Sequence, residues 1–138
     1  MTKTILLLLV EDEPMILVSA EDALVSGGYT VVTALNGQEA MARLEEQSEE
    51  FAGLITDIRL ALDIDGWEVA RKAREMNGRI AVVYMTGDSA ADWTSQGVPK
   101  SLILQKPFAD AQLVTAISTL LTELDSTPTA LPRTGRCS

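Results

Sequence analysis

The chain has 138 residues, of which 46% are hydrophobic, and a formal net charge of −9 from 20 acidic and 11 basic residues. This length suits one domain with a hydrophobic core. The acidic balance argues against binding of nucleic acid or of an anionic membrane, because both need clustered Lys and Arg. The absence of histidine excludes catalysis and metal binding by that residue, and the single cysteine, Cys137, cannot form a disulfide within the chain. We therefore expect a cytoplasmic protein.

The hydrophobic pattern predicts strands that alternate with helices. The predicted strands are apolar runs too short for helices, and the segments between them have apolar residues at helical spacing. One helix is expected to be capped by Asn36 and to bury Ala40 and Leu44. The predicted strands are 4–10, 29–33, 52–56, 80–85 and 102–105, and the other predicted helices are 14–25, 67–77 and 109–124, with at most a short, weak helix around 89–95.

This alternation predicts an α/β fold made of parallel β-α-β units with right-handed crossovers. The residues from Ser126 onward are rich in Thr, Pro, Ser and Arg and contain few apolar residues. Such a composition is typical of disorder. We therefore predict one domain over residues 1–125 and a disordered tail over 126–138.

Polar residues follow four of the predicted strands directly. Glu11 and Asp12 follow the first strand and Asp57 the third, while Thr86 and Lys106 follow the last two. The carboxyl ends of parallel strands meet at one edge of a sheet, where open α/β sheets have their functional sites. The sequence therefore predicts a site with three carboxylates, a hydroxyl and an ammonium group.

These residue types suggest phosphoryl transfer. Three carboxylates at one edge repel each other, and a divalent cation relieves that repulsion. Oxygen ligands suit Mg²⁺, so we expect Asp12 and Asp57 to bind it directly and Glu11 to act through water. Asp57 is the predicted nucleophile, which would form an aspartyl phosphate. Lys106 would neutralise charge on the phosphoryl group, and Thr86 would donate a hydrogen bond to a phosphoryl oxygen.

The set Glu11-Asp12, Asp57, Thr86 and Lys106-Pro107-Phe108, in this order and spacing, resembles the receiver domain of bacterial response regulators over residues 4–124. The resemblance implies a doubly wound, five-stranded parallel sheet of order 2-1-3-4-5 with helices on both faces. It also implies transfer of a phosphoryl group to Asp57 from a histidine kinase or a histidine phosphotransfer protein. In such a site Mg²⁺ is held by Glu11, Asp12, Asp57 and the backbone carbonyl of Arg59. Output would pass to a downstream protein through the face formed by 89–95, 102–105 and 109–124, which could also form a homodimer.

The chain departs from the family pattern at two places. Ala61 occupies the usual place of a proline, and Asp65-Gly66 arrives one residue late, which resembles a variant common among alphaproteobacterial receivers. Ile103 stands where the family usually has Tyr or Phe, so a change of ring rotamer coupled to the threonine is not available. Rearrangement of a loop or of the short helix around 89–95 is the expected substitute, with Trp93 as a candidate contact residue. Trp67 is expected to face the second helix or solvent.

Two kinds of function remain open from these residues. The first is a stand-alone phosphoacceptor receiver that signals through protein contacts and catalyses at most its own phosphorylation and dephosphorylation. The alternative is a binding module with the same fold that works without phosphorylation. Ile103 and Ala61 favour it slightly, whereas the intact acids, Thr86 and Lys106 argue against it. An FMN protein is disfavoured because the acids at 11–13 would repel phosphate. A haloacid-dehalogenase-type phosphatase is disfavoured because Arg59 stands where that family needs a second Asp.

Overall fold

The computed structural model describes residues 4–62, 64–87 and 90–126, so most of the predicted tail lies outside the described residues. Strands and α-helices alternate along the chain, and two 3-10 turns are added to them. The elements are β1 (Leu6–Val10), α1 (Pro14–Ser26), β2 (Thr30–Ala34), α2 (Gly37–Gln47), η1 (Ser48–Glu50), β3 (Phe51–Asp57), α3 (Gly66–Met76), β4 (Ala81–Thr86), η2 (Ala90–Asp92), α4 (Trp93–Gln96), β5 (Ser101–Gln105) and α5 (Asp110–Ser126).

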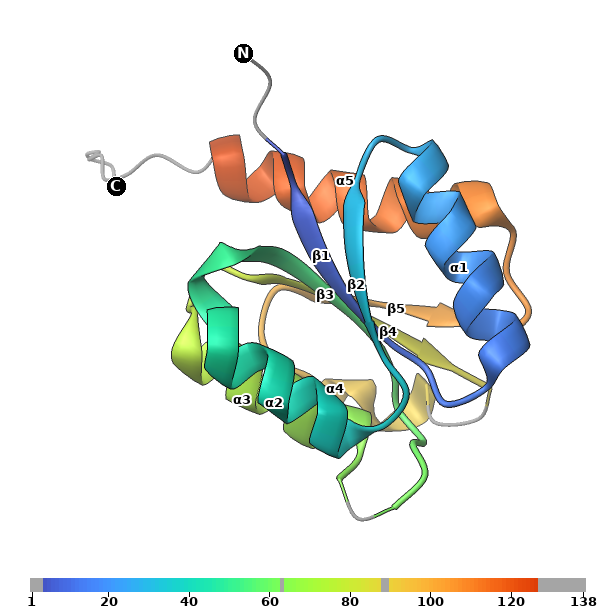
Figure 1. The fold of residues 1–138 in the computed structure, drawn as a ribbon, viewed down its shortest axis with the longest axis vertical. Coiled ribbons are helices and arrows are strands. Elements are labelled where there is room, and N and C mark those ends of the chain that lie inside the picture. Colours follow the sequence, from blue (N-terminus) through green and yellow to red (C-terminus); the bar gives the residue numbers. More distant parts are fainter. Residues whose placement is uncertain (1–3, 63, 88–89, 127–138) are drawn as a thin grey trace.

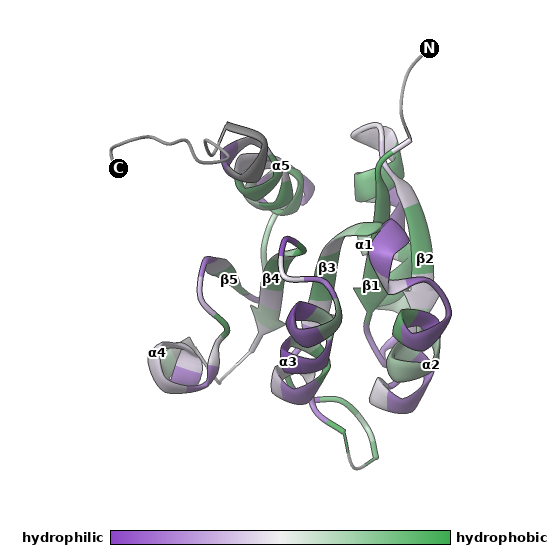
Figure 2. Cartoon of the chain, turned by 90° about the vertical axis from the view of Figure 1, so that its left-hand side faces the viewer, coloured by the Kyte–Doolittle hydropathy of each residue, from purple (hydrophilic) through white to green (hydrophobic). Residues whose placement is uncertain are grey.

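The strands form one five-stranded sheet in the order β2-β1-β3-β4-β5, and every neighbouring pair is parallel. Helices α1 and α5 cover one face of this sheet, and α2, α3 and α4 lie on the other (Figure 1). Figure 2 shows the apolar strands between the two helical layers. The predicted fold class and strand order are therefore confirmed.

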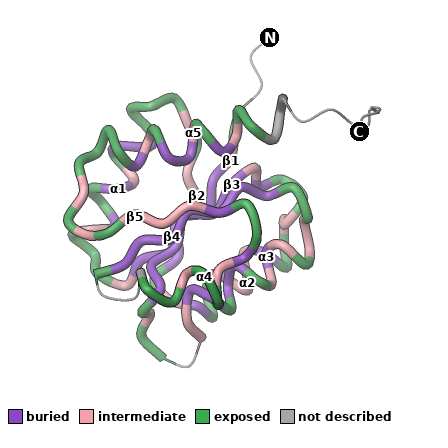
Figure 3. The backbone as a smooth tube through the Cα atoms, turned by 180° about the vertical axis from the view of Figure 1, so that it is seen from behind, coloured by how far each residue is buried: buried purple, intermediate pink, exposed green. Residues whose placement is uncertain are grey.

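Strand β1 explains why its sequence is continuously apolar. Successive side chains of a strand point to opposite faces, and both faces of this sheet are covered. Leu8 and Val10 belong to the core beneath α2 and α3, whereas Leu7 and Leu9 belong to the core beneath α1 and α5. The three central strands β1, β3 and β4 are accordingly almost completely buried, whereas most residues of the edge strands β2 and β5 are half-buried (Figure 3).

Helices α2 and α3 begin with side-chain caps. The Asn36 side chain accepts a hydrogen bond from the Glu39 N–H at 2.8 Å, as the sequence predicts. Asp65 and Glu68 form a capping box at the start of α3. A capping box satisfies two N–H groups that a helix start otherwise leaves unpaired. These caps fix where α2 and α3 begin beside the loop that follows β3.

Helix α4 has only four residues, which confirms the predicted weak helix, and side chains hold the segment around it. The buried Tyr84 hydroxyl accepts a hydrogen bond from the Val98 N–H at 3.0 Å. Ser101 Oγ donates to the Val98 carbonyl at 2.6 Å, and Trp93 Nε1 donates to Ser101 Oγ at 2.9 Å. Trp67 is buried and its ring lies 4.7 Å from that of Tyr84, so the solvent-facing alternative for Trp67 is wrong.

Candidate functional site

Backbone hydrogen bonds fix the strand ends that carry the predicted site residues. The Glu11 N–H donates to the Ala34 carbonyl at 3.1 Å, which ties the end of β1 to β2. The Ile58 N–H, directly after Asp57, donates to Met85 at 3.0 Å. The Lys106 N–H donates to the Thr86 carbonyl at 2.7 Å. Each functional side chain is therefore attached to a rigid strand end, which is how a sheet positions a site precisely enough for chemistry.

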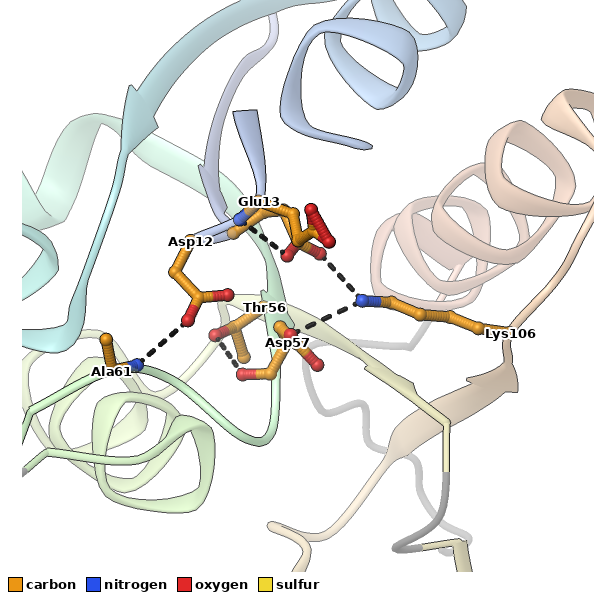
Figure 4. A network of polar contacts seen from close by, with 7 residues as sticks. Asp12, Glu13, Thr56, Asp57, Ala61 and Lys106 are labelled. Atoms are coloured by element: carbon orange, nitrogen blue, oxygen red, sulfur yellow. Dashed lines mark hydrogen bonds and ion pairs between the residues drawn. The ribbon is translucent and has the colours of Figure 1, made fainter. Parts of the chain in front are cut away.

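Lys106 joins two of the predicted carboxylates (Figure 4). Its Nζ lies 2.9 Å from Glu11 Oε1 and 3.3 Å from Asp57 Oδ2. The second oxygen of Glu11 accepts a hydrogen bond from the Glu13 N–H at 3.1 Å. Asp57 is also held through its backbone, because the buried Thr56 hydroxyl donates to the Asp57 carbonyl at 2.9 Å.

Beside this ion-pair network lies a pocket of about 410 Å³. Asp57 and Lys106 line it together with Arg59, Thr86 and Gly87. Thr86 is buried, and Arg59 is exposed. The structure thus brings Asp57, Thr86, Lys106 and Arg59 around one space, while their chemical roles stay predictions.

Burial and charge shift the pKa values of the three linked groups. Burial raises the pKa of Glu11 and of Asp57 above the ordinary carboxyl range, although Lys106 opposes the rise at both. Burial alone would lower the pKa of Lys106. The hydrogen bond to Glu11 and the charges of Asp57 and Glu11 outweigh that effect, so the pKa of Lys106 is raised. The site therefore holds its negative charge at a free-energy cost that a further cation would reduce.

The residues present fit a hard divalent cation. Ligand oxygens of Glu11, Asp12 and Asp57 all lie within 4.8 Å of one another. Carboxylates in this number, with room for water, suit Mg²⁺. Both Glu11 oxygens already have partners in Lys106 and the Glu13 N–H, and the expected role of Glu11 through water stays a prediction.

The loop after Asp57 contributes a contact that sequence reasoning missed. At the position where the family resemblance leads one to expect proline, the Ala61 N–H donates to Asp12 Oδ2 at 3.0 Å. Proline has no N–H and could not make this bond. The loop returns to the sheet at Gly66, where an added Cβ would lie 2.1 Å from the Asp57 carbonyl oxygen. The only signal in the sequence was the departure from the family pattern at Ala61.

Comparison with known proteins decides the family. The sequence profile of the response regulator receiver domain matches residues 7–118. The chain belongs to the response regulator receiver family. It is therefore a receiver domain of two-component signalling, a class of signalling module.

Two curated relatives come from Brucella abortus. The response regulator receiver protein CpdR is 34% identical over 117 residues, which cover 83% of this chain and 95% of CpdR. The sensor kinase CckA is 33% identical over 121 residues, which cover 86% of this chain and 13% of the kinase. The chain thus spans nearly all of one relative and a small part of the other.

Solved receiver structures share the fold. A response regulator receiver protein from Sinorhizobium medicae is 40% identical with a TM-score of 0.85, and the match covers 88% of this receiver and 98% of that chain. The receiver domain of a sensor histidine kinase from Pseudomonas aeruginosa is 25% identical with a TM-score of 0.74 and coverage of 87% and 99%. That second structure has a magnesium ion coordinated in its active site cleft.

Within the described part of this receiver, the helices are too short or too polar to cross a bilayer.

Proposed function

We propose that this receiver accepts a phosphoryl group on Asp57 from a histidine-phosphorylated protein, either a histidine kinase or a phosphotransfer protein. The observation that carries the proposal is the convergence of Asp57, Thr86 and Lys106 on one pocket beside the carboxylates Glu11 and Asp12. A nucleophile, a hydroxyl donor and a cation are the groups that a phosphoryl transfer needs in one place.

The transfer is an exchange of one bond for another. A carboxylate oxygen of Asp57 attacks phosphorus and forms an O–P bond, while the P–N bond to the donor histidine breaks. The electron pair of the broken bond stays on the imidazole nitrogen, and a proton from water completes the neutral imidazole. Lys106 already contacts Asp57 Oδ2 at 3.3 Å, so its charge lies beside the oxygen atoms that carry the transferred group.

Mg²⁺, held by Asp12 and Asp57 with Glu11 through water and the Arg59 carbonyl, would neutralise charge on the phosphoryl oxygens. The magnesium ion in the P. aeruginosa receiver supports this assignment for a relative with the same fold. Thr86 lies in the same pocket at the end of β4. A hydrogen bond from its hydroxyl to a phosphoryl oxygen would exist only in the modified state, and would draw the segment after β4 toward Asp57.

The output of the phosphorylated receiver would be contact with a downstream protein. We place that contact on the α4–β5–α5 face, which a second copy of the chain could also use. Since Ile103 has no ring to change rotamer, the short segment around α4 is the part we expect to rearrange.

Intact-protein mass spectrometry after incubation with acetyl phosphate and Mg²⁺ tests the proposal. We expect a gain of one phosphoryl group in wild type, and no gain in Asp57→Asn or with a chelator. Asp110→Asn, which changes an exposed acid outside the carboxylate cluster, should still gain the group. If neither acetyl phosphate nor a phosphorylated kinase modifies the folded wild type, the phosphorylation-independent binding module becomes the better account.

A further inference from the structure

The loop between β3 and α3 contacts Asp12 across the site. Among the described hydrogen bonds, Lys106 contacts the other two carboxylates but not this one. The Ala61 N–H donates to Asp12 Oδ2 at 3.0 Å, over a sequence separation of 49 residues (Figure 4). Asp12 is half-buried and Ala61 is exposed. The bond therefore links the outer rim of the site to a side chain that points into it.

The three carboxylates of the site divide the available donors between them. Lys106 Nζ contacts Glu11 and Asp57, whereas Asp12 receives the backbone amide of Ala61. A hydrogen bond from an N–H to a carboxylate is stronger than one between neutral groups. The loop amide thus gives Asp12 the fixed partner that Lys106 gives to the other two.

Packing at its end holds the loop in the conformation that aims this amide. An added Cβ on Gly37, at the start of α2, would lie 2.6 Å from the Cβ of Ile64, so the loop lies directly against that helix. Gly66 lies against the Asp57 carbonyl in the same way.

Leu62, the residue after Ala61, has a φ of 74°. A left-handed conformation costs free energy for any residue with a Cβ, so interactions elsewhere must offset it. The bond from Ala61 to Asp12, together with the packing of Ile64, is such an interaction. Backbone strain of this kind is concentrated at active sites and ligand-binding sites.

We propose that the Ala61 N–H is a positioning group for Asp12: it fixes the orientation of this carboxylate and leaves its other oxygen directed to the cation. The inference rests on the proposed function, because it assumes that Asp12 binds Mg²⁺. A ligand held by a second partner loses less conformational freedom when the metal binds, and removal of such a partner typically weakens metal affinity about 10- to 100-fold. The loop conformation and the affinity for Mg²⁺ are therefore linked in this chain.

Calorimetric titration of the full chain with Mg²⁺ gives the first test. Ala61→Pro removes the N–H, and we expect its Mg²⁺ dissociation constant to rise by about 10- to 100-fold. The matched variant Ala61→Ser keeps the N–H and should stay within about threefold of wild type, since the contact uses only the backbone. If Ala61→Pro binds Mg²⁺ as tightly as wild type, the inference is overturned and the proposed function stands.

A second measurement does not depend on how the proline variant folds. Amide exchange by NMR on wild type should show the Ala61 N–H protected both without Mg²⁺ and at saturating Mg²⁺, because a positioning bond must persist in the metal-bound form. In Asp12→Ala that amide should exchange about tenfold faster. If Mg²⁺ abolishes the protection, the amide competes with the metal and the inference is wrong. If wild type binds no Mg²⁺ at all, the metal part of the proposed function fails first, and the inference falls with it.

Discussion

Replacing Tyr84 with phenylalanine should destabilise this receiver more than its small chemical change suggests. Tyr84 is fully buried in the middle of β4, and its hydroxyl accepts the Val98 N–H at 3.0 Å. Phenylalanine keeps the ring that packs against Trp67 at 4.7 Å. The substitution therefore removes one hydrogen bond and leaves a buried backbone N–H without its acceptor.

The magnitude follows from that unpaired N–H. A typical hydrogen bond contributes about 0.5–1.5 kcal/mol net, but a buried group left without a partner costs about 1–3 kcal/mol. We expect a loss of unfolding free energy in the upper range, because Val98 is only 8% exposed and water has little access to its N–H. For a domain of this size, each kcal/mol lowers the melting temperature by roughly 4 °C.

The chain offers a matched control in its other tyrosine. Tyr29 makes its hydrogen bond to the Ser118 hydroxyl at 2.6 Å, and both side chains are only half-buried. Water can replace the lost hydroxyl there, so Tyr29→Phe should cost less than about 1 kcal/mol. Urea unfolding followed by circular dichroism gives both free energies, and equal slopes would show that both variants unfold to the same extent.

Hydrogen exchange locates the effect. The Val98 amide should lose protection in Tyr84→Phe and keep it in Tyr29→Phe. Equal losses of stability in the two variants, or an unchanged Val98 amide in Tyr84→Phe, would refute the claim that the Tyr84 hydroxyl anchors the turn after α4.

Three further predictions concern the strand ends. Asp57→Asn should stabilise the metal-free receiver at neutral pH. In wild type, burial raises the pKa of the Asp57 carboxyl in the folded state, so proton binding stabilises the fold at acid pH and this stability is lost as pH rises through that pKa. The asparagine of the variant does not titrate and therefore avoids the loss. The difference in melting temperature between Asp57→Asn and wild type should therefore shrink as the pH is lowered, and a difference that grows would contradict this. Lys106→Met should cost about 2 kcal/mol, less than the ~3–5 kcal/mol of a fully buried pair because the Lys106 side chain is 21% exposed, as urea unfolding would report. Gly66→Ala places a Cβ 2.1 Å from the Asp57 carbonyl oxygen and should lower the free energy of unfolding by more than about 2 kcal/mol. In the control Gly78→Ala the added Cβ has nothing within 4 Å, so the free energy of unfolding should stay within about 0.5 kcal/mol of wild type. Similar free energies for the two variants would be evidence against the close approach of the loop.

The sequence carried enough information to predict the architecture and the gathering of the site residues. Continuous apolar runs marked strands covered on both faces, and strands that alternate with helices admit few topologies. Once the sheet is parallel, its carboxyl ends share one edge, so Glu11, Asp57, Thr86 and Lys106 had to lie near one another. The gathering of these residues could be predicted because the sequence shows directly which side chains stand at the ends of the strands.

Contacts made by the backbone and by aromatic packing could not be predicted in the same way. Every residue except proline has an N–H, so the absence of the family's proline at Ala61 shows that a donor is present there but not that it donates to Asp12. The prediction that Trp67 faces solvent as one of two alternatives is wrong, because helical spacing alone does not reveal that Tyr84 of β4 lies next to it. Ile103 pairs in register with Tyr84, and that neighbour relation follows from the strand register and not from local sequence.

The most direct test of the central claim is to locate the phosphoryl group on the chain. Wild-type protein is phosphorylated in the presence of Mg²⁺ and then reduced with borohydride, which converts an aspartyl phosphate to homoserine. Peptide mass mapping then identifies the modified residue. We predict homoserine at position 57 alone, and at no position when the metal is chelated. Homoserine at position 12, or a modified protein in which Asp57 is intact, would contradict the assignment of Asp57 as the phosphoacceptor.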